Sequence, residues 1–206
     1  MSKMKLKICG LKQPQNIKDV VGVEPDFAGF IFYQKSPRYI DGLDKDELSN
    51  IPKNIIKVGV FVNEEIEKVI KAYHNYGLDF VQLHGDEDLE FSKELKTKGI
   101  KVIKVFRVSD TLPDSLSEHE PYSDYFLFDT ASSAYGGSGE HFNWNILSDY
   151  RLTTPFLLSG GLDLSDLDQI RDLEAPMLAG IDVNSKFEVS PGLKDVERLR
   201  ELKAQL

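Results

Sequence analysis

The chain has 206 residues, one cysteine and a formal net charge of −9, from 25 Lys and Arg against 34 Asp and Glu. This length predicts a single domain over residues 1–206 with a core that needs no disulfide or metal, and one cysteine excludes an internal disulfide and a cysteine-based zinc site. The acidic balance argues against a broad nucleic-acid or anionic-membrane surface, and the lack of a signal peptide or an apolar run of about 20 residues predicts a cytoplasmic protein without a membrane partner.

Short apolar runs recur along the chain, and between them lie loops with Gly, Pro, Asn or Asp and charged amphipathic stretches. Runs of this length and composition predict buried β-strands. The eight strand candidates are Lys5–Cys9, Phe27–Tyr33, Ile55–Val62, Phe80–His84, Ile100–Phe106, Tyr125–Asp129, Pro155–Ser159 and Met177–Val183.

The stretches between these runs predict helices. Asn63, followed by two glutamates, is an N-cap signal, and apolar residues then repeat at helical spacing from Ile66 to Tyr73. Similar patterns lie at Asp86–Lys96, Asp163–Leu173 and Lys194–Leu206, and weaker ones lie around Leu43–Ser49, Ser109–Glu118 and Phe142–Tyr150.

Eight strands that alternate with helices imply a parallel sheet, and eight units predict an α/β fold with one closed (β/α)8 TIM barrel. An open doubly wound sheet is the second possibility, although no GxGxxG fingerprint follows the first strand. Within that strand Leu6 and Ile8 share one face, and Lys7 and Cys9 share the other. An apolar outer face and an inner face that turns polar at its end predict a site at the C-terminal mouth of the barrel.

Glycine-rich and polar loops follow the last two predicted strands. Gly160 and Gly161 lie between a strand and a helix, where backbone N–H groups can turn toward a phosphate, and Asn184 with Ser185 follows the eighth strand. A simple tight turn is the alternative for the two glycines. Gly136–Gly139, after the sixth strand, is expected to be either a mobile flap over the substrate or an ordinary flexible loop.

Cys9 and Arg38 follow the first two strands. An arginine presents a planar fork suited to a carboxylate, although a lone arginine also forms surface salt bridges. Cys9 is expected to be buried or half-buried, either as a small core residue or as a thiolate base or nucleophile. Lys7, two residues earlier on the same face, would favour the thiolate electrostatically.

Asp129 ends the apolar run of the sixth strand. A carboxyl group in apolar surroundings has a raised pKa and can act as a general acid, whereas a turn or cap aspartate is the alternative. Asp182 ends the eighth strand beside the expected phosphate loop, and it is predicted to hold loop amides rather than to donate protons to a substrate.

His84 ends the fourth strand, and Gln82 shares its face of that strand, so both are expected to contact a substrate. The other histidines, His119 among them, are expected at the surface. One histidine with scattered acids lacks a metal-ligand spacing such as HxxxH, so no metal site is predicted. The sequence also lacks a GxSxG elbow and a P-loop.

Several short motifs occur together, in a fixed order, over nearly the whole chain. They are KICG at 7–10, SPRY at 36–39, VGVF at 58–61, VQLHG at 81–85, FDT at 128–130, GGSG at 136–139, LSGGL at 158–162, GIDVNS at 180–185 and PGLKD at 191–195. In these motifs the chain resembles the phosphoribosylanthranilate isomerase family of tryptophan biosynthesis.

The resemblance implies an Amadori rearrangement in a (β/α)8 barrel, without a metal or an organic cofactor. The substrate would be a small phosphosugar, N-(5-phosphoribosyl)anthranilate, and the product 1-(2-carboxyphenylamino)-1-deoxyribulose 5-phosphate. By resemblance, Cys9 takes the place of the general base, Asp129 that of the general acid, and Arg38 lies at the anthranilate end. The phosphate end falls at Gly160, Gly161 and Asp182–Ser185.

The chain departs from the family pattern at Lys186, where glycine usually follows the serine; this lysine would contact the phosphate or point to solvent. Two alternatives stay open. One is a histidine-pathway aminoaldose isomerase, which carries an aspartate where Cys9 stands here. The other is a non-catalytic barrel that binds a phosphosugar. The sequence does not decide between a monomer and a homodimer.

Overall fold

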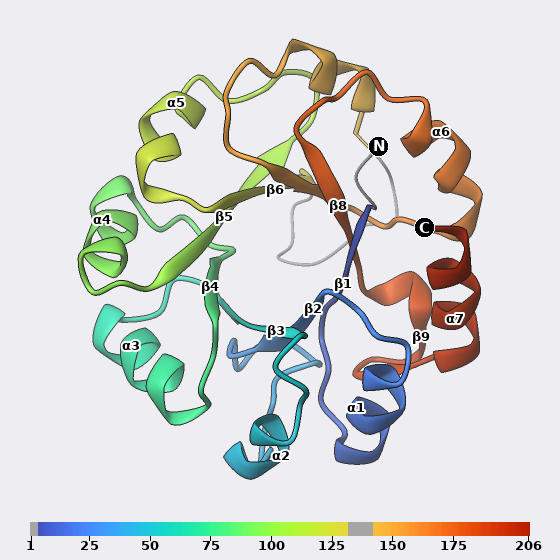
Figure 1. Ribbon diagram of the computed structural model, residues 1–206. Helices are drawn as coiled ribbons and strands as arrows, with labels where there is room; N and C mark the ends of the chain where they lie inside the picture. Colours follow the sequence, from blue (N-terminus) through green and yellow to red (C-terminus); the bar gives the residue numbers. More distant parts are fainter. Residues whose placement is uncertain (1–3, 132–141) are drawn as a thin grey trace.

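The strands form a closed barrel in the computed structural model, which describes residues 4–131 and 142–206 (Figure 1). Eight parallel strands follow one another in sequence order, and the eighth pairs with the first. They are β1 (Lys5–Ile8), β2 (Phe27–Ile31), β3 (Ile56–Phe61), β4 (Phe80–Leu83), β5 (Lys101–Val108), β6 (Tyr125–Thr130), β7 (Phe156–Leu158) and β8 (Leu178–Val183). The predicted barrel is confirmed, and each strand ends within two residues of its predicted bounds.

Helices surround the barrel, as parallel strands joined by crossover connections require (Figure 1). The α-helices are α1 (Pro14–Val21), α2 (Lys45–Ser49), α3 (Ile66–Asn75), α4 (Leu89–Thr97), α5 (Leu116–His119), α6 (Leu167–Arg171) and α7 (Val196–Gln205). The 3-10 helices are η1 (Glu120–Tyr122), η2 (Trp144–Asp149), η3 (Leu164–Asp166) and η4 (Ser185–Phe187). The weakest sequence patterns correspond to the short α2, the four-residue α5 and the 3-10 helix η2.

Two local predictions were wrong. Asn63 is not the N-cap of α3, because that position falls to Glu65. Asn63 instead adopts a φ of 50° and its side-chain oxygen accepts a hydrogen bond from the backbone N–H of Asp86, which ties the loop after β3 to the loop after β4. His119 is not a surface residue: its ring is buried against Phe106, with ring centroids 5.5 Å apart.

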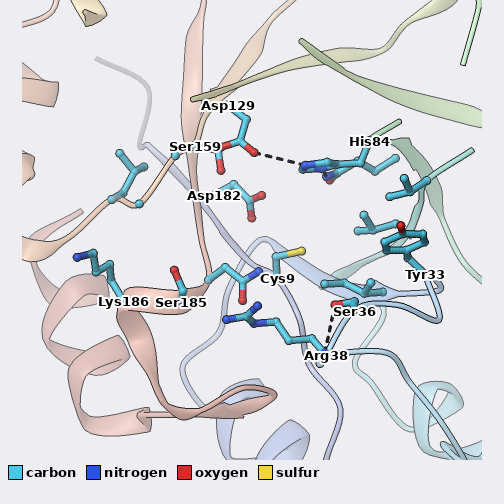
Figure 2. Close-up of a pocket in the computed structure, with 18 of the residues that line it drawn as sticks. Cys9, Tyr33, Ser36, Arg38, His84, Asp129, Ser159, Asp182, Ser185 and Lys186 are labelled. Carbon is cyan, nitrogen blue, oxygen red and sulfur yellow. Dashed lines mark hydrogen bonds and ion pairs between the residues drawn. The ribbon is translucent and has the colours of Figure 1, made fainter. Parts of the chain in front are cut away.

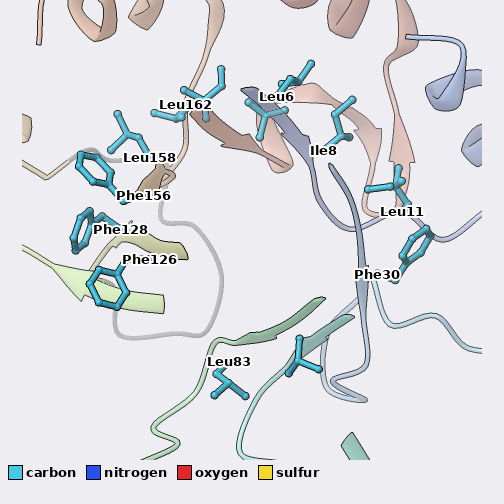
Figure 3. Packing of buried hydrophobic residues seen from close by; sticks show 14 of the residues in the cluster. Leu6, Ile8, Leu11, Phe30, Leu83, Phe126, Phe128, Phe156, Leu158 and Leu162 are labelled. Carbon is cyan, nitrogen blue, oxygen red and sulfur yellow. The ribbon is translucent and has the colours of Figure 1, made fainter. Parts of the chain in front are cut away.

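The strand faces divide the apolar side chains into two clusters. The outward-facing side chains, such as Leu6, Ile8, Phe126 and Phe128, pack between the barrel and its helices (Figure 3). The inward-facing side chains fill the barrel interior as a second, smaller cluster: Phe27, Val58, Phe80, Ile103, Val105, Leu127 and Leu157. The predicted alternation of an outer apolar face with a separate inner face therefore holds for β1, β4 and β6.

An aromatic cluster fills the N-terminal end of the interior. Phe27, Phe80 and Tyr125 each lie at the start of a strand, and their rings meet edge to face with centroids 5.7–6.2 Å apart. Such contacts are favourable in addition to the area they bury. Because this end is filled by large rings, space for a ligand is left at the other end, where the strands finish.

A short hairpin follows β8 and was not predicted. Its strands are β9 (Glu188–Ser190) and β10 (Leu193–Lys194), paired antiparallel just before α7. Gly136–Gly139, the predicted flap, lies outside the described residues. Among the helices of the described ranges, none combines the length and the apolar character that crossing a membrane requires.

Candidate active site

A pocket of about 280 Å³ opens at the C-terminal ends of the strands (Figure 2). Its position is the one at which barrels of this kind carry their sites. All the residues that the sequence predicted for the site line this pocket, and they come from the ends of six strands. They are Cys9, Arg38, Gln82, His84, Asp129, Gly160, Gly161, Asp182, Asn184 and Ser185.

Cys9 follows β1 and is 4% exposed. Burial raises the pKa of its thiol, and the neighbouring Lys7 ammonium, within hydrogen-bonding reach of the sulfur, acts against that rise. Lys7 is itself fully buried on the inner face of β1. Burial alone would lower the pKa of Lys7, but the Asp182 carboxylate and Cys9 together raise it above its usual value, so the ammonium keeps its charge.

Asp182 pairs with Lys7 across the seam where the barrel closes. The two residues stand opposite each other in the register of β1 and β8, and Lys7 Nζ donates to Asp182 Oδ1 at 2.9 Å. The predicted role of Asp182 in holding loop amides is therefore wrong, since its hydrogen bond within the described residues comes from this buried lysine. The pair holds the Lys7 ammonium beside the thiol, where the Asp182 carboxylate offsets part of its effect on the pKa of Cys9.

Asp129 lies near the end of β6 in polar rather than apolar surroundings. Its carboxylate accepts a hydrogen bond from the Thr130 N–H at 3.0 Å and lies 3.3 Å from His84 Nε2. The apolar side chains of its strand, Phe126 and Phe128, point to the outer face instead. On the other side of the imidazole, Gln82 Nε2 lies 3.0 Å from His84 Nδ1, so a line of polar groups leads from β4 to the carboxyl group.

The loops after β7 and β8 form the glycine-rich side of the pocket. Gly160 has a φ of 101°, and a Cβ there would lie 2.2 Å from Thr130 Oγ1, so glycine is needed for close approach to the end of β6. Gly161 has a φ of 72° and begins the turn into η3. Lys186 follows Ser185 in η4, is exposed and lines the same pocket.

Arg38 follows β2 and enters the pocket beside Cys9 (Figure 2). Its guanidinium is held by Glu188 of the unpredicted hairpin: Nε lies 3.0 Å from both carboxylate oxygens, and Nη2 lies 2.7 Å from Oε2. Arg38 is thus both an ion-pair partner and a pocket residue.

Several residues of the site were missed by the sequence analysis. Glu188 and Lys194 belong to the hairpin, and a signal for Lys194 was present in the PGLKD motif, to which no role was given. In the loop after β4, Glu87 accepts hydrogen bonds from the Gly85 N–H at 3.0 Å and from the Asn63 N–H at 2.8 Å. These two bonds hold the loop that follows His84.

Within the described ranges, His, Cys, Asp and Glu side chains form no group of three or more that could hold a metal ion.

The fold and this pocket together define a (β/α)8-barrel enzyme with its site at the C-terminal ends of the strands. A family model described as N-(5'phosphoribosyl)anthranilate (PRA) isomerase matches residues 6–205. The chain belongs to this isomerase family.

Individual relatives match over nearly the full chain. The N-(5'-phosphoribosyl)anthranilate isomerase of Parabacteroides distasonis is 42% identical over 211 residues, which cover 98% of this chain and 93% of the relative. The crystal structure of phosphoribosyl anthranilate isomerase from Thermotoga maritima is 34% identical, with a TM-score of 0.81 and coverage of 96% of each chain. A further isomerase structure, in complex with reduced 1-(o-carboxyphenylamino)-1-deoxyribulose 5-phosphate, is 29% identical, with a TM-score of 0.78 and coverage of 98% of each chain. These matches favour neither the histidine-pathway isomerase nor the non-catalytic barrel.

Proposed function

We propose that the chain converts N-(5-phosphoribosyl)anthranilate into 1-(2-carboxyphenylamino)-1-deoxyribulose 5-phosphate, the Amadori step of tryptophan biosynthesis. The observation that carries the proposal is that Cys9 and Asp129 line one pocket, which also contains Arg38 and a glycine-rich loop. Arginine suits a carboxylate, and glycine N–H groups suit a phosphate. The related isomerase bound to a reduced carboxyphenylamino-deoxyribulose phosphate supports the same substrate class.

In the proposed reaction Asp129 is the general acid and Cys9 the general base. Asp129 gives its proton to the ribose ring oxygen, the C1–O bond breaks, and the nitrogen lone pair forms a C1=N iminium. The cation acidifies the C2 proton, which the Cys9 thiolate removes. The electrons of that C–H bond form C1=C2 and leave a neutral amine, and the resulting enolamine tautomerises to the ketone.

The surroundings of the two groups support this division. Burial raises the pKa of the Cys9 thiol, and Lys7 beside the sulfur opposes that rise, which favours the thiolate, the basic form of Cys9. His84 contacts Asp129 and is partly exposed, so it offers a route by which the carboxyl group regains its proton from solvent. Gly160 and Gly161, with Asn184 and Ser185, would bind the phosphate at a distance from the reacting carbons.

The proposal is tested by following the fluorescence of the anthranilate group as substrate is consumed, in the presence of EDTA. Four proteins are compared with the native chain: Cys9→Ser, Asp129→Asn, Asp182→Asn and, as a matched exposed control, Asp149→Asn. General acid or base catalysis contributes about 100- to 10,000-fold, so the first two variants should lose at least about 100-fold in kcat. They should still bind the reduced product analogue.

Each other outcome has a definite meaning. Fast decay in Cys9→Ser would keep the activity and overturn the role of the thiol. A large loss in Asp182→Asn with none in Asp129→Asn would move the acid from β6 to β8. No decay with the folded native chain would refute the proposed activity and favour a binding barrel or another phosphosugar.

A further inference from the structure

The hairpin that follows β8 contributes a buried carboxylate to the arginine side of the pocket. The Glu188 side chain is 3% exposed, and it lies between two cations, with Arg38 Nη2 at 2.7 Å from Oε2 and Lys194 Nζ at 2.7 Å from Oε1. Arg38 and Lys194 lower the pKa of Glu188 against the effect of burial, which alone would raise it. The group is therefore an ionised carboxylate that contacts both basic side chains.

The geometry of this contact leaves part of the guanidinium available. Glu188 engages Arg38 through Nε and Nη2, which is one edge of the planar fork. Within the described residues Nη1 donates no hydrogen bond, and the Arg38 side chain, 17% exposed, lines the pocket. A guanidinium gripped along one edge presents its remaining N–H groups in a fixed direction.

The hairpin itself is held rigidly. The Gly192 N–H donates to Glu188 Oε1 at 3.1 Å, and Lys194 Nζ also donates to Asn184 Oδ1 at 2.7 Å. The side-chain amide of the buried Asn16 forms two hydrogen bonds with the backbone of Lys194. It donates to Lys194 O at 3.0 Å and accepts from the Lys194 N–H at 2.7 Å. Glu188 is thus fixed to α1 and to the loop after β8.

The part of Arg38 that faces the pocket carries positive charge. Glu188 contacts only Nε and Nη2 of the guanidinium, and burial lowers the pKa of Lys194 against the opposing effect of the Glu188 carboxylate. A ligand group with one negative charge would pair with the remaining edge of the guanidinium. The carboxylate of an anthranilate group has that charge and the planar shape that an arginine fork matches.

We propose that Glu188 is a positioning residue of the carboxylate subsite: it grips one edge of the Arg38 guanidinium so that the other edge faces the carboxylate of the substrate. This inference rests on the proposed function, because that function supplies the carboxylate. It gives the hairpin β9–β10 a role in specificity as well as in the fold.

The test compares two ligands that differ by one carboxylate. They are reduced 1-(o-carboxyphenylamino)-1-deoxyribulose 5-phosphate and the phenylamino analogue that lacks the carboxyl group. Inhibition constants for both are measured on the native chain, Glu188→Gln, Arg38→Met and the double variant. Glu67→Gln, on the exposed face of α3, is the matched control, and the inhibition constant for inorganic phosphate reports whether the rest of the pocket is intact.

We expect Glu188→Gln to weaken binding of the carboxylate ligand about 10- to 100-fold and binding of the phenylamino ligand hardly at all. The reason is that only the first ligand has a carboxylate to form charge-assisted hydrogen bonds with Arg38. In the Arg38→Met background the same change should have no further effect. KM for the substrate should rise more than kcat falls. If Glu188→Gln does not fold, Glu188→Asp, which withdraws the carboxylate from the fork, should give a smaller selective loss.

Equal weakening of both ligands would overturn the inference, because Glu188 would then support only the fold. Tighter binding of the carboxylate ligand would also overturn it, since Glu188 would then compete with the ligand for Arg38. If the native chain neither turns over the substrate nor distinguishes the two ligands, the proposed function itself fails. If the native chain does both and Glu188→Gln keeps the preference, only the role of Glu188 fails.

Discussion

Replacement of Lys7 by methionine should raise the pKa of the Cys9 thiol. The ammonium lies within hydrogen-bonding reach of the sulfur and opposes the effect of burial. A unit charge about 4 Å away, at an effective dielectric constant of about 20, interacts by about 4 kcal/mol. Asp182 already offsets part of this field, so we expect the pKa of Cys9 to rise by less than this single charge would cause.

The assay is the rate of alkylation of Cys9 by iodoacetamide over a pH series, because alkylation requires the thiolate. The chain has one cysteine, so every label reports on this site. The alkylation profile of Lys7→Met should move to higher pH, and kcat/KM should follow it. Asp182→Asn should move the profile the other way, since the Asp182 charge raises the pKa of Cys9.

Lys71→Met, on the exposed surface of α3, is the control for loss of a lysine. Loss of one partner of a buried ion pair costs about 3–5 kcal/mol, so circular dichroism must show that Lys7→Met is folded. Superimposable profiles for the native chain and a folded Lys7→Met would refute the reasoning, because Lys7 would then not act on the thiol.

Three further predictions follow from the geometry of the pocket. Gly160→Ala should lower the free energy of unfolding by more than Gly42→Ala does, because the new methyl group at position 160 would clash with Thr130. At Gly42 the only cost is the strain of a left-handed backbone, about 1–2 kcal/mol. Urea unfolding measures both losses of stability, and equal losses would contradict the packing argument. Arg38→Ala should raise KM for the anthranilate-bearing substrate, and unchanged steady-state kinetics would remove Arg38 from the site. The folded-state pKa of Glu188 is depressed, so its contribution to stability is present above the unfolded value of about 4.3 and is lost as pH falls through the folded value. The free energy of unfolding, measured with urea from neutral to acidic pH, should therefore fall less steeply for Glu188→Gln than for the native chain. Parallel curves would contradict this linkage.

The strands could be predicted because a buried parallel strand is a continuous apolar run, and the runs that begin at Phe27 and Tyr125 stand out from their charged neighbours. Helix starts were less certain. Asn63 has the residue type of an N-cap, but a tertiary hydrogen bond to Asp86 takes its side chain instead. The hairpin was missed because strands of three and two residues are too short to show a periodicity.

The pocket residues were predictable because the C-terminal strand ends of a barrel meet at one mouth. Their pairings were not, because partners such as Arg38 and Glu188 are 150 residues apart in the chain. Lys7 and Asp182 could have been paired by noting that the first and eighth strands of a barrel are neighbours and that both residues face inward. The surroundings of Asp129 were misjudged because the aromatic residues beside it in sequence point to the opposite face of β6.

The seam between β1 and β8 also bears on how the protein is made. Asp182 is added to the growing chain 175 residues after Lys7. At about 5–20 residues per second, β1 waits about 10–35 seconds for the strand that supplies its counter-ion. Until then burial of the Lys7 ammonium would leave it without a counter-ion, so the first strand should stay solvated until β8 is made, and the barrel should close only after that.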